Sequence, residues 1–293
     1  ARVGKGAFQE ISGEVVNICL QMTTNEVEST HSGIEFDDNN SIPKENVLKE
    51  GEVQTAEQAI QLDNPDCRIS FELAGLTGET LSKISDFGKG SVSGDGPHYL
   101  RKFWEYNNLP CIAKRWVNSP DHSSGYTGRS DLILWDENHF NPTIEIGFRH
   151  HGQRVYGKKG VAIGKAGKFR FTPYADGLFD DNVAVLVPND SEHLIALWEY
   201  STSGQLQKDI SKLDKKMSVT AGTFTKVKFE LNRWLNIARD KYPNGLPLAH
   251  TNDPKQWIFH GHPSASVTWN DETKTTAISE LRQDDTVLQV AVA

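Results

Sequence analysis

The sequence predicts an α+β protein in which a curved, β-rich region of mixed strands precedes packed helices. Between Phe87 and Val187, short apolar runs are separated by Gly, Pro and Asn, which is typical of strands joined by turns. After Ser191, apolar residues recur at helical spacing instead. With 293 residues and 37% apolar content, the chain is long enough for one large domain or two smaller ones.

The N-terminal part predicts a hairpin followed by a connector. Residues 6–22 contain a turn at Ser12-Gly13 and a β-branched strand from Val15 to Leu20. Because a lone hairpin is marginally stable, we expect it to belong to a larger sheet. Residues 25–66 are polar and acidic and predict a connecting segment, with a helix over Thr55 to Leu62.

The region that follows is expected to be β-rich and then helical. The expected strands are residues 130–135, 142–148, 159–164, 168–174 and 182–188. The first expected helix runs from Ser191, as N-cap, to Leu213, and Gly204 is a position where it can break in two. A second helix is expected over Phe229 to Tyr242, ending at Pro243-Asn244-Gly245.

Several classes of protein are disfavoured by composition. The longest apolar runs fall far short of the roughly 20 residues that a membrane helix needs, so no membrane partner is expected. Cys19, Cys67 and Cys111 are odd in number and form no C-x-x-C pair, which argues against a disulfide framework and a zinc site and favours a reducing cytoplasm. Both ends of the chain look like cuts, since no leader follows Ala1 and the C-terminus stops inside an apolar pattern.

The net charge of −8 counts against a nucleic-acid partner, but the charges are unevenly distributed. Residues 149–170 contain no Asp or Glu. Their cations are Arg149, Arg154, Lys158, Lys159, Lys165, Lys168 and Arg170. A solvated strand face would normally include acids, so this run favours a phosphate-contacting surface.

The stretch from Gly88 to Asp95 is a Gly-rich loop whose backbone N–H groups are able to approach a phosphate. It is neither a Walker A loop nor a Rossmann fingerprint, because the required Lys and the framing strand and helix are missing. A plain surface turn is an equally good interpretation.

Aromatic and basic side chains alternate just after this loop. They are His98, Tyr99, Arg101, Lys102, Phe103 and Trp104. Such side chains are able to stack on bases while the cations meet phosphates. The alternative is an amphipathic helix with Leu100, Phe103 and Trp104 in the core, and for Phe103 and Trp104 we favour it.

No pattern predicts catalysis or metal binding. The pairs His150-His151 and His260/His262 have no acidic or Cys partner at a recognised spacing, so we interpret them as structural. A nuclease pattern of the P-D…E-x-K type is incomplete, because Gly147 stands where a Lys should follow Glu145. Nucleophile motifs such as G-x-S-x-G are absent from the sequence.

Five segments in series resemble the C-terminal half of large class I adenine-specific DNA methyltransferases, which accompany restriction and BREX- or DISARM-like defence systems. The segments are residues 6–17, 90–106, 155–188, 215–229 and 256–263. In that family a Rossmann-like domain binds S-adenosylmethionine, and an N/D-P-P-Y/F motif holds the flipped adenine. This sequence contains neither that motif nor the Gly-containing cofactor loop.

The resemblance implies that the chain is a fragment lacking catalytic activity of its own. Residues 1–24 are then the last strands of the methyltransferase domain, residues 25–75 an acidic connector, and residues 76–293 a target-recognition domain. Within that domain, residues 87–190 are expected to be β-rich, 191–245 helical, and 246–293 a C-terminal segment. The implied partners are double-stranded DNA, the catalytic domain of the same polypeptide and other defence-system subunits; S-adenosylmethionine belongs to the parent protein.

Candidate DNA-binding residues follow from the resemblance and from side-chain chemistry together. The family motif supports Asp95, Arg101, Lys159 and Tyr174, and Ser93 stands where many relatives carry Thr. The full set is Ser93, Asp95, Arg101, Arg115, Tyr126, Arg129, Arg154, Lys158, Lys159, Lys165, Arg170 and Tyr174.

A second hypothesis is a protein-interaction module that docks partner defence subunits. The acidic connector and the C-terminal region would make the contacts. The hypothesis rests on the net charge of −8 and on the segments around Trp198, Trp234, Trp257 and Trp269. Charge reversal at Lys158 and Lys159 that left all activity intact would favour it over DNA reading.

Overall fold

The structure is a computed structural model, and its contacts divide the chain into unit 1, Ala1–Leu76, and unit 2, Thr77–Ala293. Each unit is described by itself. The described residues are 2–4, 18–19, 21–25, 28–34, 43–64, 67, 69–71, 79–102, 113–121, 123, 127–134, 147–175, 177–214, 218–246, 265–270 and 272–280.

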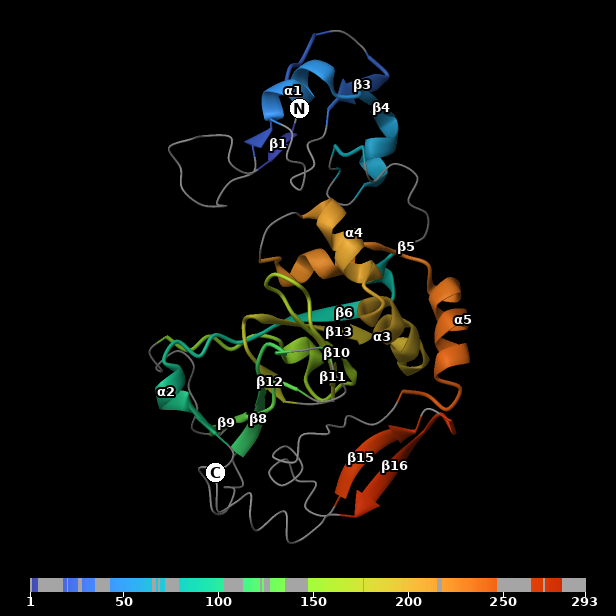
Figure 1. The fold of residues 1–293 in the computed structure, drawn as a ribbon. Helices are drawn as coiled ribbons and strands as arrows, with labels where there is room; N and C mark the ends of the chain where they lie inside the picture. The colour runs from blue at the N-terminus through green and yellow to red at the C-terminus, as the bar shows by residue number, and fades with distance from the viewer. Residues whose placement is uncertain are drawn as a thin grey trace. The chain divides into compact units, whose positions relative to one another are not determined.

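The described residues of unit 1 form short antiparallel strand pairs, an α-helix and a 3-10 helix (Figure 1). Strand β1 (Arg2–Gly4) pairs with β2 (Ile18–Cys19), and β3 (Thr30–Gly33) pairs with β4 (Gln54–Glu57). Helix α1 spans Lys44–Glu50. Only residues 18 and 19 of the expected strand from Val15 to Leu20 are described, and they lie in β2.

The prediction of a helix over Thr55 to Leu62 is wrong. Residues Gln54–Glu57 form strand β4, and Ala59–Asp63 form a 3-10 helix, η1. Pairing with β3 explains the difference: Ala56 is buried opposite His31, and the Gln58 side chain donates a hydrogen bond to the Thr30 carbonyl at 3.2 Å. These tertiary contacts override a local helix propensity.

The centre of unit 2 is an antiparallel sheet with the strand order β11-β10-β13-β6. Its strands are β6 (Ser85–Lys89), β10 (Gly160–Gly164), β11 (Phe171–Tyr174) and β13 (Val183–Pro188). The strands expected over 159–164, 168–174 and 182–188 are confirmed, although β11 begins three residues later than expected.

A second sheet in unit 2 has the order β12-β8-β9-β7. Its strands are β7 (Leu100–Lys102), β8 (Ala113–Val117), β9 (Asp131–Leu134) and β12 (Leu178–Phe179). Strand β12 runs parallel to β8, and the other pairs are antiparallel. The strand expected over 130–135 is therefore confirmed as β9, whereas residues 142–146 of another expected strand lie outside the described residues.

The core of unit 2 lies on both faces of the central sheet. On one face, a cluster of buried apolar side chains packs the second sheet and η5 (Gln153–Val155) against the central sheet. The cluster consists of Val117, Val155, Ala162, Tyr174, Phe179, Val183, Val185 and Val187. On the other face, helix α3 (Leu194–Thr202) contacts β10, β11 and β13. Because both faces are covered, β10 and β13 are continuously buried, and their sequences are uninterrupted apolar runs rather than alternating ones.

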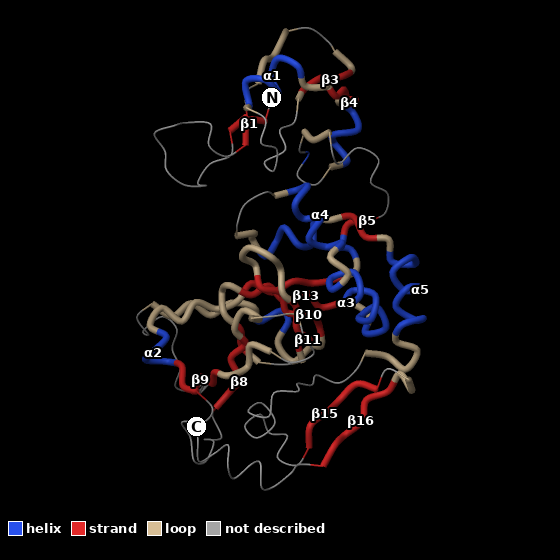
Figure 2. Tube along the Cα trace, viewed as in Figure 1, coloured by secondary structure: helices blue, strands red, loops and turns tan. Residues whose placement is uncertain are grey.

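Helices α3 and α5 (Leu231–Lys241) lie on one side of strands β10, β11 and β13, whereas α2 (Gly96–Tyr99) lies away from them, near β9 (Figure 2). Helix α4 (Gln205–Leu213) follows α3 after a break at Gly204, which has a φ of +85° in the left-handed region. Helix α5 lies within the range expected for the second helix, and Phe229 belongs to β14 (Lys228–Phe229) instead.

The prediction of Ser191 as the N-cap is wrong by one residue, because Asp190 caps the helix. The Asp190 carboxylate accepts a hydrogen bond from the Glu192 N–H at 2.9 Å, and the first turn is a 3-10 helix, η6 (Ser191–His193). A carboxylate at this position also interacts favourably with the positive end of the helix dipole.

The remaining elements of unit 2 are short. Strand β5 (Glu79–Thr80) pairs with β14, and β15 (Ala265–Asn270) pairs with β16 (Thr275–Glu280). The described residues of unit 2 also include the 3-10 helices η3 (Leu81–Lys83) and η7 (Ala221–Lys226) and helix α2 (Gly96–Tyr99). None of the helices in the described ranges is long and apolar enough to cross a membrane.

Candidate nucleic-acid interface

The acid-free basic segment, residues 149–170, runs through η5, along β10 and into the turn that leads to β11. All seven of its cations are among the described residues. Lys165 is buried, and the exposed ones are Arg149, Arg154, Lys158, Lys159, Lys168 and Arg170. Most of the charge in this segment is therefore available to a partner.

Strand β10 divides these cations into two groups. The first basic group, Arg154, Lys158 and Lys159, precedes the strand, and the second basic group, Lys168 and Arg170, follows it. Residues 160–167 separate the two groups, and the five residues of β10 alone span about 16 Å. A continuous run in the sequence thus becomes two patches at opposite ends of one strand.

Acidic partners are scarce around these patches. Lys158 Nζ lies 3.7 Å from Asp86 Oδ2, but both side chains are about half exposed, so the pair contributes little. Arg149, Arg154, Lys159, Lys168 and Arg170 make no ion pair with any residue that the structure describes. Exposed cations of this kind attract solvent anions, which the phosphates of DNA would displace.

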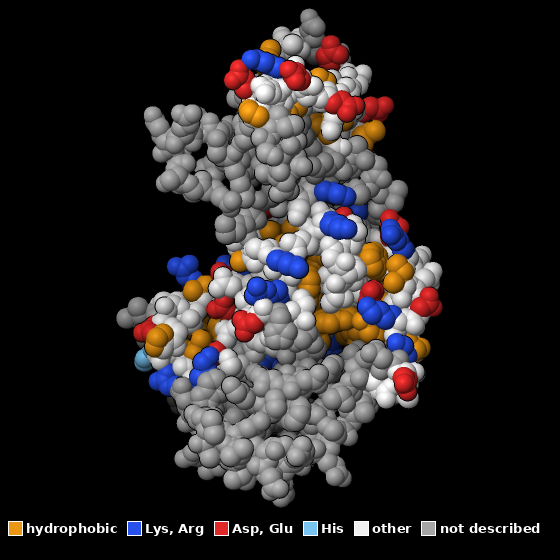
Figure 3. Space-filling model, in the orientation of Figure 1, with side chains coloured by type: hydrophobic (Ala, Val, Ile, Leu, Met, Phe, Trp, Pro, Cys, Tyr) orange, Lys and Arg blue, Asp and Glu red, His pale blue; other side chains and the backbone are white. Residues whose placement is uncertain are grey.

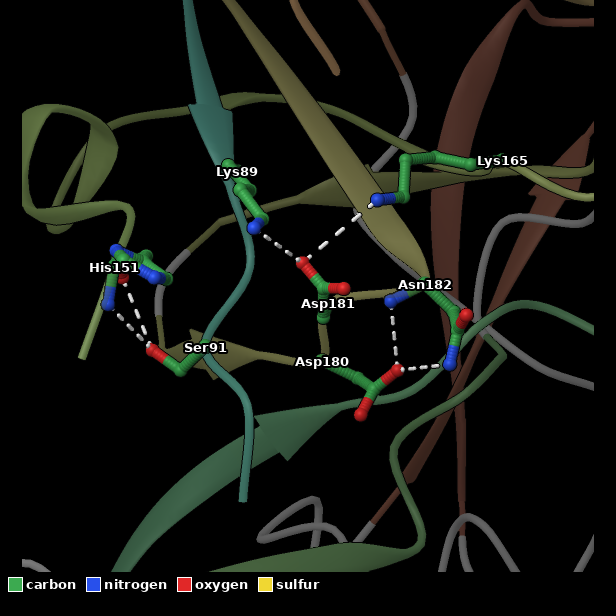
Figure 4. A network of polar contacts seen from close by, with 7 residues as sticks. All are labelled: Lys89, Ser91, His151, Lys165, Asp180, Asp181 and Asn182. Atoms are coloured by element: carbon green, nitrogen blue, oxygen red, sulfur yellow. Dashed lines mark hydrogen bonds and ion pairs between the residues drawn. The ribbon is translucent and has the colours of Figure 1, made fainter. Parts of the chain in front are cut away.

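Lys165 has a different environment (Figure 4). Its Nζ lies 3.9 Å from Asp181 Oδ1, and Lys89 Nζ approaches the same oxygen at 3.3 Å. Burial lowers the pKa of Lys165, and the Asp181 carboxylate opposes part of that shift. With 9% of its side chain exposed, Lys165 is an interior cation held by Asp181.

The Gly-rich segment is joined to the basic segment through Ser91. The Ser91 hydroxyl donates to the His151 carbonyl at 3.1 Å and accepts from the His151 N–H at 3.0 Å (Figure 4). The Tyr156 hydroxyl donates to the same carbonyl. The backbone of His151 therefore joins the two segments.

Close packing accounts for the glycines of this segment. A Cβ on Gly90 would lie 1.8 Å from the Asp180 carbonyl oxygen, and one on Gly88 would lie 2.5 Å from a Val155 methyl carbon. These contacts leave no space for any larger residue. The surface turn considered for this stretch is wrong for both residues, because Gly88 lies in strand β6 and Gly88 and Gly90 are buried. Close packing accounts for these two glycines without a phosphate cradle.

The residues after this segment form a capped turn and a strand. The Asp95 carboxylate accepts a hydrogen bond from the His98 N–H at 3.3 Å, so it caps α2, and half-buried Ser93 precedes it. The amphipathic helix considered over residues 98–104 ends at Tyr99, and the chain continues as β7. Phe103 and Trp104 lie outside the described residues.

Among the predicted arginines, Arg101 and Arg115 are exposed on β7 and β8. The Arg101 guanidinium donates to the Leu100 carbonyl at 2.8 Å and to the Pro97 carbonyl. Both side chains lie in the second sheet of unit 2, on strands adjacent to β9.

Arg129 and Tyr174 lie in the interior. Arg129, 5% exposed, donates to the Thr127 carbonyl at 3.2 Å, to the Thr172 hydroxyl at 3.1 Å and to the Pro173 carbonyl. Tyr174, 1% exposed, donates to the Gly177 carbonyl at 2.7 Å. Together with Lys165, these predicted residues would need the fold to open before they met DNA. Tyr126 lies outside the described residues.

Sequence reasoning omitted two exposed cations, Arg149 and Lys168, from its set of DNA-binding residues. Both stand in the acid-free run, so the charge pattern itself was the signal that could have found them. No group of three or more His, Cys, Asp or Glu residues suited to a metal ion occurs among the described residues, and His260 and His262 lie outside them.

Comparisons with known proteins reveal a distant likeness. No protein-family model matches the sequence, and no curated protein matches it. Among solved structures, the crystal structure of the HsdS subunit from Thermoanaerobacter tengcongensis is similar over 55% of this chain and 35% of that chain. The identity is 12% and the TM-score 0.34, and the matched part is about a third of the HsdS chain.

Proposed function

We propose that this chain binds double-stranded DNA as the target-recognition part of an adenine-specific DNA methyltransferase of a restriction or phage-defence system. The observation that carries the proposal is the acid-free segment of 22 residues, in which five exposed cations make no ion pair among the described residues. Long cations of this kind supply the sequence-independent part of DNA affinity by neutralising phosphates.

The net charge of −8 is compatible with this function because it belongs to unit 1. Unit 1 contains five Lys and Arg and fourteen Asp and Glu, a net charge of −9. The remaining 26 cations and 25 acids give unit 2 a charge of +1. The unit that carries the basic segment is therefore close to neutral overall and has positive patches.

Recognition of bases would come from other side chains. Arg101 and Arg115 are exposed on the second sheet, and an arginine is able to donate two hydrogen bonds to a guanine in the major groove. The two basic groups would then fix the position of the chain on the backbone, which carries no sequence information directly.

Methyl transfer would be carried out by another domain that binds S-adenosylmethionine. The sequence contains no two consecutive prolines, so its residues do not supply an N/D-P-P-Y/F motif. No catalytic step is therefore assigned to this chain, and the catalytic domain of the parent protein is the partner that we propose.

The test is a fluorescence-anisotropy titration of the whole chain against duplex DNA over a salt series. Each phosphate contact contributes about −0.9 to the slope of log affinity against log salt concentration. We expect Lys159→Gln combined with Arg154→Gln, and Lys168→Gln combined with Arg170→Gln, each to make the slope less negative by about 1–2.

The matched control is Lys49→Gln in unit 1, where Lys49 is already paired with Glu45 at 2.6 Å. It should leave the slope unchanged. Binding by the unmodified chain that does not depend on salt, or a slope unaffected by both double substitutions, would contradict the proposal.

A protein-docking function is the second candidate, because unit 1 combines its negative charge with exposed apolar side chains. These are Met22, Val53, Leu62 and Ile69, which are 98%, 59%, 71% and 63% exposed. Recovery of a partner subunit with the chain after nuclease treatment would support it, and charge reversal at Lys158 and Lys159 should then leave that recovery unchanged.

A further inference from the structure

The turn between β10 and β11 is fixed by its central aromatic residue. Phe169 is 5% exposed, and its ring centroid lies 5.1 Å from that of Phe224 in η7. Its neighbours Lys168 and Arg170 are both exposed. Because Phe169 points inward, the two flanking cations of the second basic group point to solvent.

The same turn is attached to helix α4 and to the chain that follows it. The Phe169 N–H donates to Gln207 Oε1 at 3.3 Å, and the Val219 N–H donates to the Lys165 carbonyl at 3.2 Å. Ala166 also forms an isolated bridge with Ser218. The second basic group is therefore held beside α4.

Helix α4 presents further lysines to solvent. It buries Leu206, Ile210 and Leu213, whereas Lys208, next to Gln207, is exposed. Lys212 follows one turn later, and side chains four residues apart lie on the same side of a helix. Its ammonium side chain is 34% exposed. Figure 3 shows Lys and Arg side chains over α4 and over the neighbouring part of unit 2.

The acid within α4 is occupied by other partners. Asp209, with 12% of its side chain exposed, accepts hydrogen bonds from the Tyr200 hydroxyl and from Gln205 Nε2, both at 2.9 Å. Its distance to Lys212 Nζ is 3.5 Å. Asp214, half-buried at the C-terminal end, is the other acid of this helix. Lys208 makes no ion pair among the described residues.

We propose that Lys208 and Lys212 of α4 and the second basic group form one phosphate-binding surface, which contacts the DNA backbone beside the bases that are read. The proposal rests on the proposed function and adds a helix that the basic segment does not include. Along a helix axis the two lysines are about 6 Å apart, close to the axial rise of two nucleotides in one strand of about 7 Å. The spacing of the two lysines therefore suits phosphates that are two nucleotides apart in one strand.

The experiment measures the salt dependence of binding by the whole chain to two duplexes of unrelated sequence. We expect Lys208→Gln to make the slope less negative by about 0.9. Lys208→Gln with Lys212→Gln should have a larger effect that stays below about 1.8, because Lys212 is already paired with Asp209 at 3.5 Å. The slope should change by the same amount for both duplexes, because contacts to phosphates do not depend on the base sequence. Lys208→Arg keeps the charge and should keep the original slope.

The matched control is Arg239→Gln, an exposed cation on α5 that lies outside the proposed surface and should leave the slope unchanged. Thermal unfolding identifies any variant that does not fold. If the double variant does not fold, the slope measured for Lys208→Gln alone tests the proposal. An unchanged slope for folded Lys208→Gln would overturn the proposal.

The two proposals fail in distinguishable ways. If substitutions in the second basic group change the slope and those in α4 do not, only the α4 surface is refuted. If the unmodified chain shows no salt-dependent DNA binding, the proposed function itself is refuted.

Discussion

At the scale of single residues, burial separates cations of similar sequence context into structural and accessible ones. Arg129 and Arg115 both belong to the β-rich region and are both candidates on chemistry. The Arg129 guanidinium donates hydrogen bonds to Thr127, Thr172 and Pro173 inside the fold, whereas Arg115 is exposed on β8. A guanidinium that satisfies buried acceptors stabilises the fold, because those acceptors would otherwise lose their hydrogen bonds.

Replacement of Arg129 by Met should therefore lower the free energy of unfolding by about 2–4 kcal/mol, since it leaves buried oxygens without donors. Urea denaturation measures this loss. Arg154→Met is the control, since Arg154 is exposed and makes no ion pair among the described residues, and it should change stability by less than about 0.5 kcal/mol. If Arg129→Met instead left stability unchanged and reduced DNA binding, the structural role of Arg129 would be refuted.

At the scale of elements, polar bonds tie together the helices that cover one face of the central sheet. The Tyr200 hydroxyl of α3 donates to Asp209 of α4 at 2.9 Å, and Lys241 Nζ of α5 lies 2.9 Å from Glu199 Oε2 of α3. Burial, followed by the charge of Asp209 and its hydrogen bond, raises the pKa of Tyr200 far above its ordinary value. The folded protein thus keeps this hydroxyl protonated at alkaline pH.

This shift predicts a loss of stability above about pH 10. The unfolded tyrosine ionises there and the folded one does not, so the unfolded state is favoured by about 1.4 kcal/mol for each further pH unit. Below pH 10 the contribution is fully present. Tyr200→Phe lacks the titrating group, and we expect its free energy of unfolding to fall less steeply with pH.

The measurement is urea denaturation of both proteins between pH 8 and 11. The unmodified protein should be more stable at pH 8, because it keeps the hydrogen bond, and the difference should shrink above pH 10. Other groups that titrate in this range, such as Tyr156 and Tyr242, are present in both proteins, and burial raises their pKa values too. Their contributions to the free energy of unfolding therefore cancel in the difference between the two proteins. A difference that is constant with pH would refute the assignment.

At the scale of the whole molecule, the charge is divided between an acidic unit and a nearly neutral one with positive patches. Unit 1 has a net charge of −9 and unit 2 of +1. A negative unit on the same chain repels DNA at distances up to the Debye length, which is about 30 Å at 0.01 M salt and 8 Å at 0.15 M.

Neutralising exposed acids of unit 1 should therefore speed DNA association at low salt. We expect the triple variant Glu50→Gln, Glu52→Gln and Glu57→Gln to associate faster than the unmodified chain at 0.01 M salt, with the difference lost at about 0.15 M. Stopped-flow fluorescence measures both rates. Equal rates at low salt would show that the charge of unit 1 does not act on DNA binding.

Periodicity and turn residues predicted much of unit 2, because those signals are local. The apolar runs at β10 and β13 and the breaks at Gly204 and Gly245 predicted strands and helix ends that the structure contains. The same local signals were wrong for residues 55–62, where pairing with β3 overrides helix propensity. The acid-free run of cations was also visible in the sequence.

Whether each of these predicted cations is accessible to a phosphate depends on contacts between residues that are far apart in the sequence. Burial of Arg129, Lys165 and Tyr174 results from partners up to 44 residues away in the sequence, which no local pattern contains. Strand β10 separates the cations into two groups, and the bond from Phe169 to Gln207 brings the second group beside α4. Charge is a property of residue type, but access to a phosphate depends on which side chains the core leaves outside.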